Sequence, residues 1–199
     1  FHHACRVAAT GHAEFYYGDY RGSPQELVSA VLRGYLYQGQ WNLRQQRFRG
    51  TATRNVDRPH FVHFLQNHDQ VANSALGLRL HDLSTPGRFR ALTALLLLTP
   101  ETPLLFMGQE FAASSPFFYF ADHEVDVAKM VREGRLEFLR RFERVATFPP
   151  EELADPADRQ TFEQSKLDWD DCRRHAAVLR LHRELLALRR DDPVFRRQQ

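Results

Sequence analysis

The sequence is poor in cysteine and has no long hydrophobic run, and each shortage excludes a class of protein. Its cysteines, Cys5 and Cys172, lie far apart without a CxxC partner, which excludes a disulfide-rich scaffold. We expect both thiols to be reduced and the protein to be cytoplasmic. The longest apolar run, residues 94–98, is far shorter than the ~20 residues of a membrane span, so we expect no membrane partner.

The chain also lacks an excess of charge of one sign. It carries 27 lysines and arginines against 25 acidic residues, and the two signs are interspersed. Because no basic patch with interleaved aromatic residues emerges, we do not expect nucleic acid as a partner. The composition is 43% hydrophobic and 12% aromatic, which is enough to bury a core and is unlike that of a disordered protein.

Several motifs that carry chemistry are missing from the sequence. Neither HExxH nor CxxC is present, and the adjacent His2 and His3 would face different directions on a helix, so we expect no metal site. No GxSxG elbow presents a nucleophilic serine. The polar, arginine-rich residues 40–58 contain no glycine-rich phosphate cradle, so we read them as a solvated loop and expect no cofactor.

The chain has no initiating methionine, and it opens on residues that already form a helical pattern. Residues 2–10 predict a helix that ends near Gly11, with nothing to cap its start. We therefore expect the chain to begin inside a larger protein. Residues 14–20 follow as an aromatic loop, which suits either stacking on a sugar or filling a core.

Capping residues and apolar spacing predict further helices. Ser23, Pro24 and Glu26 form the start of a helix that we expect to end near Gly39. Thr85 and Pro86 start a second, which runs to about Thr99 and Pro100. The later helices that we expect cover residues 124–132, 135–145 and 171–190.

Two short apolar runs without alternation predict buried strands. They are residues 61–66 and 104–107, and each ends in polar residues, at 67–73 and at 108–110. A strand, a helix and a second such strand indicate an α/β fold with parallel strands covered on both faces. In that architecture a site lies at the carboxyl ends of the strands, where both polar clusters fall.

The first polar cluster, Asn67-His68-Asp69-Gln70, allows several interpretations. His68 and Asp69 fit a metal pair, a general base with its orienting carboxylate, or a hydrogen-bonded core pair. Adjacent side chains at a strand end point to different sides, which disfavours a dyad. We prefer separate roles on one substrate, with Asp69 as a carboxylate and its neighbours as hydrogen-bonding groups. Such amide-rich surroundings suit a polyhydroxylated ligand.

Here the chain resembles a known family. Residues 64–73 are similar to the fourth conserved region of the α-amylase superfamily of glycoside hydrolases, and residues 104–110 resemble its eighth barrel strand. The Gln-Asn-His-Asp-Gln form, the loop from Pro116 to His123 and the segment from Ser165 to Trp169 resemble the malto-oligosyltrehalose trehalohydrolases more closely. The resemblance spans nearly the whole chain.

The resemblance implies a partial (β/α)8 TIM barrel, about its last two strands and the surrounding helices, with a helical C-terminal extension. Residues 1–145 would be the C-terminal part of the barrel, and residues 146–199 a loop and long helix that pack on or follow it. It implies hydrolysis of the α-1,4 bond beside the terminal trehalose unit of maltooligosyl trehalose or a related α-glucan. Asp69 would be the transition-state stabiliser, and His68, Asn67 and Gln70 would bind substrate.

The sequence departs from the family in one respect. The nucleophile and the general acid of this family lie on the fourth and fifth strands, and no GxRxDA motif or acid-bearing counterpart precedes Asp69. We therefore expect the isolated chain to be inactive. The alternatives are another enzyme of the superfamily, such as a glucan-branching enzyme or an amylase, and a non-catalytic sugar-binding remnant.

Overall fold

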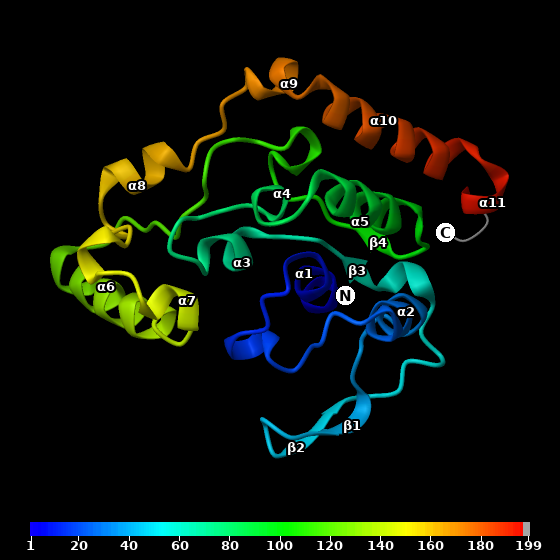
Figure 1. Cartoon of the computed structure of the whole chain (residues 1–199), viewed down its shortest axis with the longest axis horizontal. Helices are drawn as coiled ribbons and strands as arrows, with labels where there is room; N and C mark the ends of the chain where they lie inside the picture. The colour runs from blue at the N-terminus through cyan, green and yellow to red at the C-terminus, as the bar shows by residue number, and fades with distance from the viewer. Residues whose placement is uncertain (197–199) are drawn as a thin grey trace.

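The computed structural model of this chain describes residues 1–196 (Figure 1). The elements in chain order are α1 (His2–Thr10), η1 (Phe15–Tyr17), α2 (Pro24–Arg33), β1 (Gln38–Asn42), β2 (Arg47–Gly50), η2 (Arg58–His60), β3 (Val62–His63), α3 (His68–Ala72), α4 (Leu80–Leu83), α5 (Pro86–Leu98), β4 (Thr102–Pro103), η3 (Gln109–Phe111), α6 (Val125–Leu139), α7 (Glu143–Ala146), η4 (Pro150–Glu152), α8 (Arg159–Gln164), α9 (Asp171–Arg174), α10 (Ala176–Asp191) and α11 (Pro193–Arg196). Among these, no helix is both long and apolar enough to cross a membrane.

The centre of the fold is the parallel pair β3 and β4, joined through α5. The Thr102 amide donates to the Phe61 carbonyl at 2.9 Å, and the Leu104 amide donates to the His63 carbonyl at 2.8 Å. The predicted α/β arrangement with parallel strands is therefore confirmed. β3 covers only two residues of the predicted 61–66. The second strand was predicted at the wrong place, because β4 is formed by Thr102–Pro103, which pair with β3, and residues 104–107 continue without strand structure.

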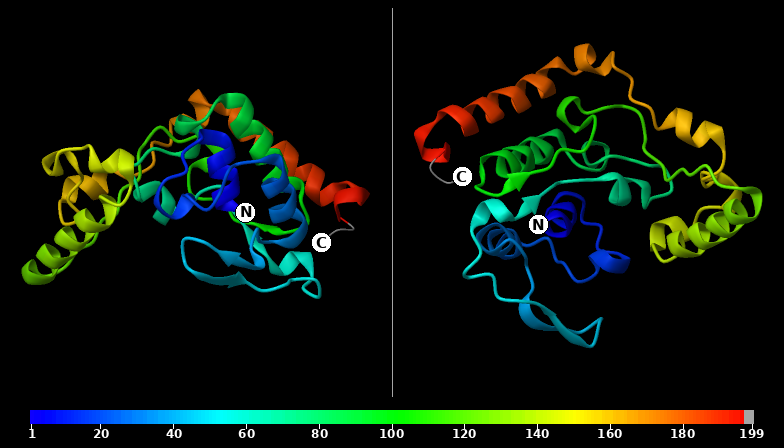
Figure 2. Two further views of the ribbon diagram at one scale, coloured as in Figure 1. Left: turned by 60° about the horizontal axis from the view of Figure 1, so that its bottom comes forward. Right: turned by 180° about the vertical axis from the view of Figure 1, so that it is seen from behind.

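Helices cover this pair from two sides. Figure 1 shows α1 and α2 on one side of β3, and α5 with α10 outside it on the other; Figure 2 shows the same order from behind. The core between them is apolar and consists of Cys5, Ala9, Leu65, Leu80, Phe89, Leu92, Leu96 and Leu97. The predicted start and end of α5 are confirmed, since Thr85 accepts a hydrogen bond from the Arg88 amide as the N-cap.

The helix that starts at Ser23 has the predicted capping box but ends earlier than predicted. It stops at Arg33 rather than near Gly39, because Gly34 turns the chain with φ of +79°. A side chain at Gly34 would also meet the Phe61 ring at 2.6 Å. Residues 40–58, predicted to be a loop, instead contain most of the antiparallel hairpin β1–β2.

The hairpin is held to the loop before α2 by charge. Asp19, whose side chain is 6% exposed, accepts from Arg44 at 2.8 Å and from Arg49 at 2.9 Å. These arginines lower the pKa of Asp19, Arg44 first. This ion pairing could not be anticipated from a polar run, because its acceptor lies outside the run.

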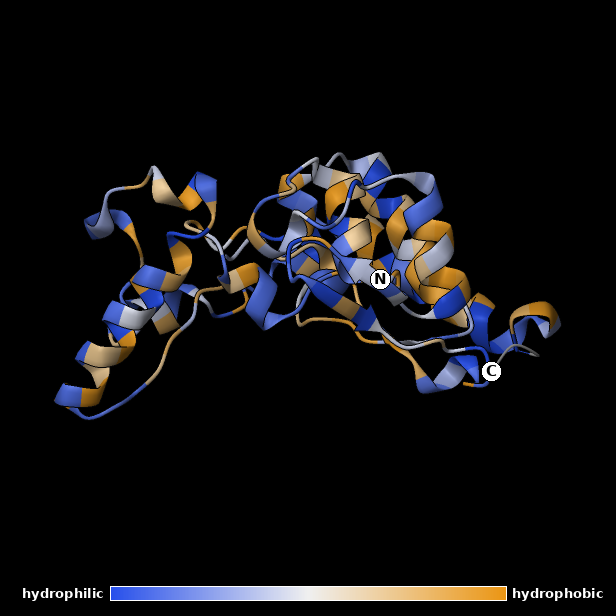
Figure 3. Cartoon of the chain, turned by 90° about the horizontal axis from the view of Figure 1, so that it is seen from below, coloured by the Kyte–Doolittle hydropathy of each residue, from blue (hydrophilic) through white to orange (hydrophobic). Residues whose placement is uncertain are grey.

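A second core joins η1 to α6 and α7. Its buried members are Ala4, Val7, Tyr17, Tyr20, Ala75, Leu139, Phe142 and Val145. In Figure 3, α6 and its neighbours form a group apart from the main helices, and both groups carry hydrophobic and hydrophilic residues side by side. The helices predicted at 124–132 and 135–145 are instead one long helix, α6, and the short α7.

The final helix, predicted as one piece over 171–190, is broken at His175. Its first turn, α9, docks on the loop after η3, where buried Asp171 accepts from the Ser114 amide at 2.7 Å. The His175 ring lies 2.9 Å from the Ala112 carbonyl and donates to it. These contacts fix the turn, and α10 then packs along α5.

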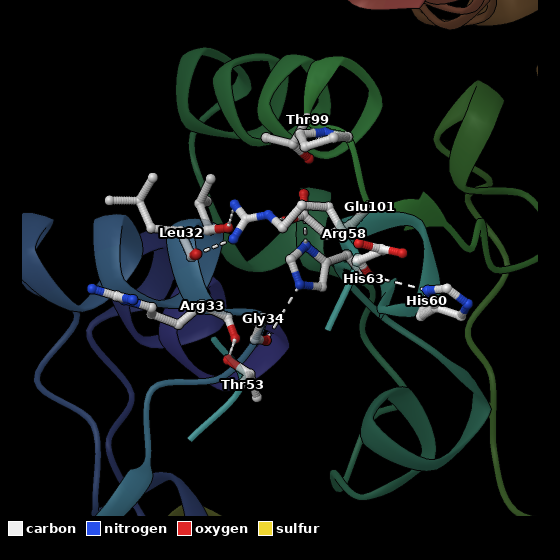
Figure 4. A network of polar contacts seen from close by, with 12 residues as sticks. Leu32, Arg33, Gly34, Thr53, Arg58, His60, His63, Thr99 and Glu101 are labelled. Carbon is white, nitrogen blue, oxygen red and sulfur yellow. Dashed lines mark hydrogen bonds and ion pairs between the residues drawn. The ribbon is translucent and has the colours of Figure 1, made fainter. Parts of the chain in front are cut away.

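A buried polar network ties the amino ends of β3 and β4 to α2 (Figure 4). The Glu101 carboxylate is fully buried and pairs with Arg58 Nε at 3.0 Å, and His63 Nδ1 lies 3.8 Å from it. The Arg58 guanidinium also donates to the carbonyls of Val31 and Leu32, the last turn of α2. Burial lowers the pKa of His63 to about 4, so the ring is neutral at neutral pH.

Candidate active site

The Asn-His-Asp-Gln cluster lies where the chain leaves β3, at the carboxyl end of the strand. Residues 67–73, predicted to be a loop, instead form the one-turn helix α3. Its N-cap is Asn67, whose side-chain oxygen accepts from the Gln70 amide at 3.2 Å. Just before it, buried Gln66 accepts from the Leu80 amide at 2.8 Å, which fixes the direction in which the helix starts.

His68 and Asp69 are exposed on the first turn of α3. Their side chains are 68% and 66% exposed, and His68 Nε2 lies 3.6 Å from Asp69 Oδ1. Among the described residues, the Asp69 carboxylate accepts no hydrogen bond. Both groups are therefore open to a ligand, and neither is a buried core pair.

Asp69 and Gln70 line an open cavity of about 490 Å³. Its other lining residues come from α1, η1, α6 and the end of α3, and they are His3, Tyr16, Asn73, Arg135 and Phe138. A second cavity of about 500 Å³ shares His3 and Gln70 with it and extends along β3 past Val62 and Phe64. A carboxylate, amides, a guanidinium and aromatic rings in one hollow form a surface that suits a polyhydroxylated ligand.

The chain matches no protein-family model. It does match curated proteins named malto-oligosyltrehalose trehalohydrolase. That from Deinococcus radiodurans is 44% identical over 100% of this chain and 33% of its own length, and that from Arthrobacter ramosus is 38% identical over 97% and 33%. This chain is homologous to one third of a malto-oligosyltrehalose trehalohydrolase. It spans about a third of the length of the curated relatives it matches.

A further curated relative is similar over nearly the whole chain. The malto-oligosyltrehalose trehalohydrolase of Saccharolobus solfataricus is 33% identical over 96% of the chain. Among solved structures, a Salmonella typhimurium protein described as a candidate alpha amylase superposes with a TM-score of 0.87 and 40% identity. That superposition covers 97% of this chain and 32% of the other, so the α/β fold agrees with an amylase-like neighbour.

Of the four residues predicted to form the site, the structure brings two into the cavity. Asp69 and Gln70 line it, whereas His68 lies beside Asp69 and Asn67 serves as the cap of α3. Because Asn67 accepts through its oxygen, its side-chain amide nitrogen remains available to donate. The cap is thus compatible with a second, ligand-binding role.

Sequence reasoning missed the rest of the cavity wall. His3 lies on α1, and burial lowers its pKa to about 4, so it presents a neutral ring. Tyr16 comes from the aromatic loop that suited either a sugar or a core, and it does face the cavity. Arg135 and Phe138 come from α6, and nothing in the sequence indicated that they contribute to this cavity, because they are more than 60 residues from Asp69.

His2, adjacent to His3, has a different environment. Its Nδ1 lies 2.6 Å from the Leu65 carbonyl, and its ring stacks on Phe64 at 5.1 Å. Burial lowers the pKa of His2 well below its usual range, so this ring is neutral. Within residues 1–196, no group of three or more histidine, cysteine, aspartate or glutamate side chains is arranged to hold a metal ion.

Proposed function

We propose that this chain forms the last two strands of a (β/α)8 barrel, within a longer glycoside hydrolase of the α-amylase superfamily. The parallel pair β3 and β4 with α5 between them has the connectivity of one barrel repeat. Apolar side chains on β3 and in the segment directly after β4 are exposed, with Val62 at 53%, Leu104 at 41% and Met107 at 42%. The remaining strands would cover these side chains. Residues 1–145 would then belong to the barrel, and residues 146–199 would pack on or follow it.

The complete protein would hydrolyse the α-1,4-glucosidic bond next to the terminal trehalose unit of maltooligosyl trehalose and release trehalose. The homology of the whole chain to proteins named malto-oligosyltrehalose trehalohydrolase supports this substrate. A polyhydroxylated oligosaccharide also fits the mixed polar and aromatic wall of the cavity. No cofactor takes part in this class of reaction.

Asp69 would act as the transition-state stabiliser. The observation that carries this role is its exposed carboxylate, which accepts no internal hydrogen bond and lines the cavity at the carboxyl end of β3. A fixed anion binds sugar hydroxyls more strongly as the ring flattens and gains positive charge in the oxocarbenium-like transition state. His68, Gln70 and the free amide nitrogen of Asn67 would bind further hydroxyls of the substrate.

The bond-breaking groups would come from outside this chain. A retaining glycosidase needs a carboxylate nucleophile and a carboxylic general acid, with their carboxyl groups about 5 Å apart. Asp69 is the one carboxylate among the predicted site residues. Because it would stabilise the transition state, neither the nucleophile nor the general acid is supplied by these residues. The isolated chain would therefore be inactive.

A second function, an amylase, is favoured by the Salmonella typhimurium structure. The two functions differ in their products. An amylase would release maltose or longer maltooligosaccharides from starch, whereas a trehalohydrolase would release trehalose from maltooligosyl trehalose.

A chimera tests the proposal. Residues 1–199 would replace the matching third of the Deinococcus radiodurans relative, and the purified chimera would be given maltooligosyl trehalose or maltooligosaccharide of equal length. We expect free trehalose from the first and slow cleavage of the second. Release of maltose at similar rates from both would support the amylase, and a folded chimera without activity on either would refute both assignments.

A further inference from the structure

Helix α3, which carries Asp69, has little stabilisation of its own. It has five residues, a single turn, and no glycine ends it. Nucleating a helix is unfavourable, and a one-turn helix forms too few hydrogen bonds to offset this, so its geometry depends on contacts from outside. The position of the Asp69 carboxylate therefore depends on whatever holds both ends of this turn.

The start of α3 is held by the Asn67 cap and by the hydrogen bond from the Leu80 amide to the Gln66 side chain. Its end is held by Arg135, which comes from α6. Arg135 Nη2 donates to the Ala72 carbonyl at 2.8 Å, and Nη1 donates to Asn73 Oδ1 at 2.7 Å. The planar fork of the guanidinium thus binds one backbone and one side-chain acceptor at the same time.

The guanidinium is itself fixed by aromatic rings. Its carbon lies 5.2 Å from the centroid of the Tyr119 ring and 5.6 Å from that of Phe138. Asn73 in turn donates to the Tyr16 hydroxyl at 3.2 Å. Tyr16, Asn73 and Arg135 form a continuous polar chain, and all three line the cavity that contains Asp69.

We propose that Arg135 is a positioning residue, which locks the end of α3 and thereby sets the place of the Asp69 carboxylate in the cavity. Through it, the helix group of α6 and α7, which lies apart from α5 and α10 in Figure 1, is coupled to the reaction. Phe138 and Leu139 on the same helix join the second core, so the position of α6 is set by packing and transmitted by Arg135. This inference rests on the proposed role of Asp69.

The matched control is Arg132, three residues earlier on α6. Its side chain is 62% exposed and pairs with Asp155 at 3.0 Å, away from α3. Arg132→Met and Arg135→Met remove the same charge and the same number of donors from one helix. A difference between these variants therefore reports on the contact with α3.

The first measurement is catalysis by the chimera on maltooligosyl trehalose. Because a displacement of about 1 Å costs on the order of 100-fold in rate, we expect kcat of Arg135→Met to fall about 10- to 100-fold. KM should stay within about twofold, and thermal unfolding should match that of Arg132→Met. Arg135→Lys should recover only part of kcat, since one ammonium group does not reproduce the fork. Equal kcat values for Arg135→Met and Arg132→Met would overturn the proposal.

The second measurement separates this proposal from the proposed function. Hydrogen exchange of the Val71 and Asn73 amides, which bond to Asn67 and Asp69 within α3, should be at least tenfold faster in Arg135→Met. Amides of α5 should be unaffected. If the unmodified chimera releases no trehalose but hydrogen exchange in α3 is faster in Arg135→Met, the proposed substrate is wrong while the positioning role of Arg135 is supported. If exchange in α3 is unchanged, the positioning role of Arg135 is wrong whatever the activity.

Discussion

The buried ion pair between Arg58 and Glu101 gives the sharpest prediction about stability. Glu101 is fully buried, and its carboxylate lies 3.0 Å from Arg58 Nε (Figure 4). Arg58→Met would leave that carboxylate without its cation and would also remove two donors from the last turn of α2, at Val31 and Leu32. Breaking a buried pair from one side typically costs 3–5 kcal/mol. Arg58 is itself 28% exposed, so we expect about 3 kcal/mol.

The assay is urea unfolding of the chimera, followed by circular dichroism, with Arg54→Met as the control. Arg54 is exposed and lies four residues earlier in the same segment. Its substitution should change the free energy of unfolding by less than about 0.5 kcal/mol. The double variant Arg58→Met/Glu101→Leu removes both charges, and should recover much of the loss, because an apolar pair leaves no uncompensated charge. Equal stability of Arg58→Met and Arg54→Met would refute the account of this network.

Three further predictions concern the pH dependence of stability, the backbone conformation at Gly34 and the folding of the isolated chain. The pKa of His63 is about 4 in the folded state, below its ordinary 6.5. Between these two pH values the unfolded chain binds a proton that the folded chain does not, so the free energy of unfolding should fall as the pH drops from 6.5 to 4. His63→Gln should flatten this slope in acid unfolding. Gly34→Ala should lower the melting temperature by several degrees, because φ is +79° and the new methyl meets the Phe61 ring; Gly87→Ala, with open space around it, should not. The isolated chain should aggregate or melt without a sharp transition, since the strand pair has open edges; a sharp transition of monomeric protein would contradict this.

Local signals in the sequence were sufficient where a few neighbouring residues decide the structure. Ser23, Pro24 and Glu26 predicted the start of α2, and Thr85 with Pro86 predicted the start of α5. The cap residue Asn67 gave the same kind of signal, but a row of polar residues after a strand was interpreted as a loop. The helix α3 was missed for that reason.

Features that depend on distant residues were not predictable. The hairpin β1–β2 is held by Asp19, which lies outside the polar run that forms it. The early end of α2 is different, because Gly34 at positive φ is a local signal that the prediction of an end near Gly39 overlooked. The break at His175 follows from contacts with Ala112 on another loop. Likewise, the motif predicted where Asp69 lies, whereas Arg135, which holds the helix of Asp69, is more than 60 residues away.

The most direct test of the central claim is the rate of trehalose release by the chimera and by its Asp69→Asn variant. The amide keeps the shape of the side chain and removes the charge that would stabilise the transition state. Asp57→Asn, before β3 and at the opposite end of the strand, controls for loss of an exposed carboxylate. We predict that Asp69→Asn lowers kcat by about 100-fold or more with unchanged thermal unfolding, and that Asp57→Asn has no effect. Near-normal release of trehalose by Asp69→Asn would contradict the account.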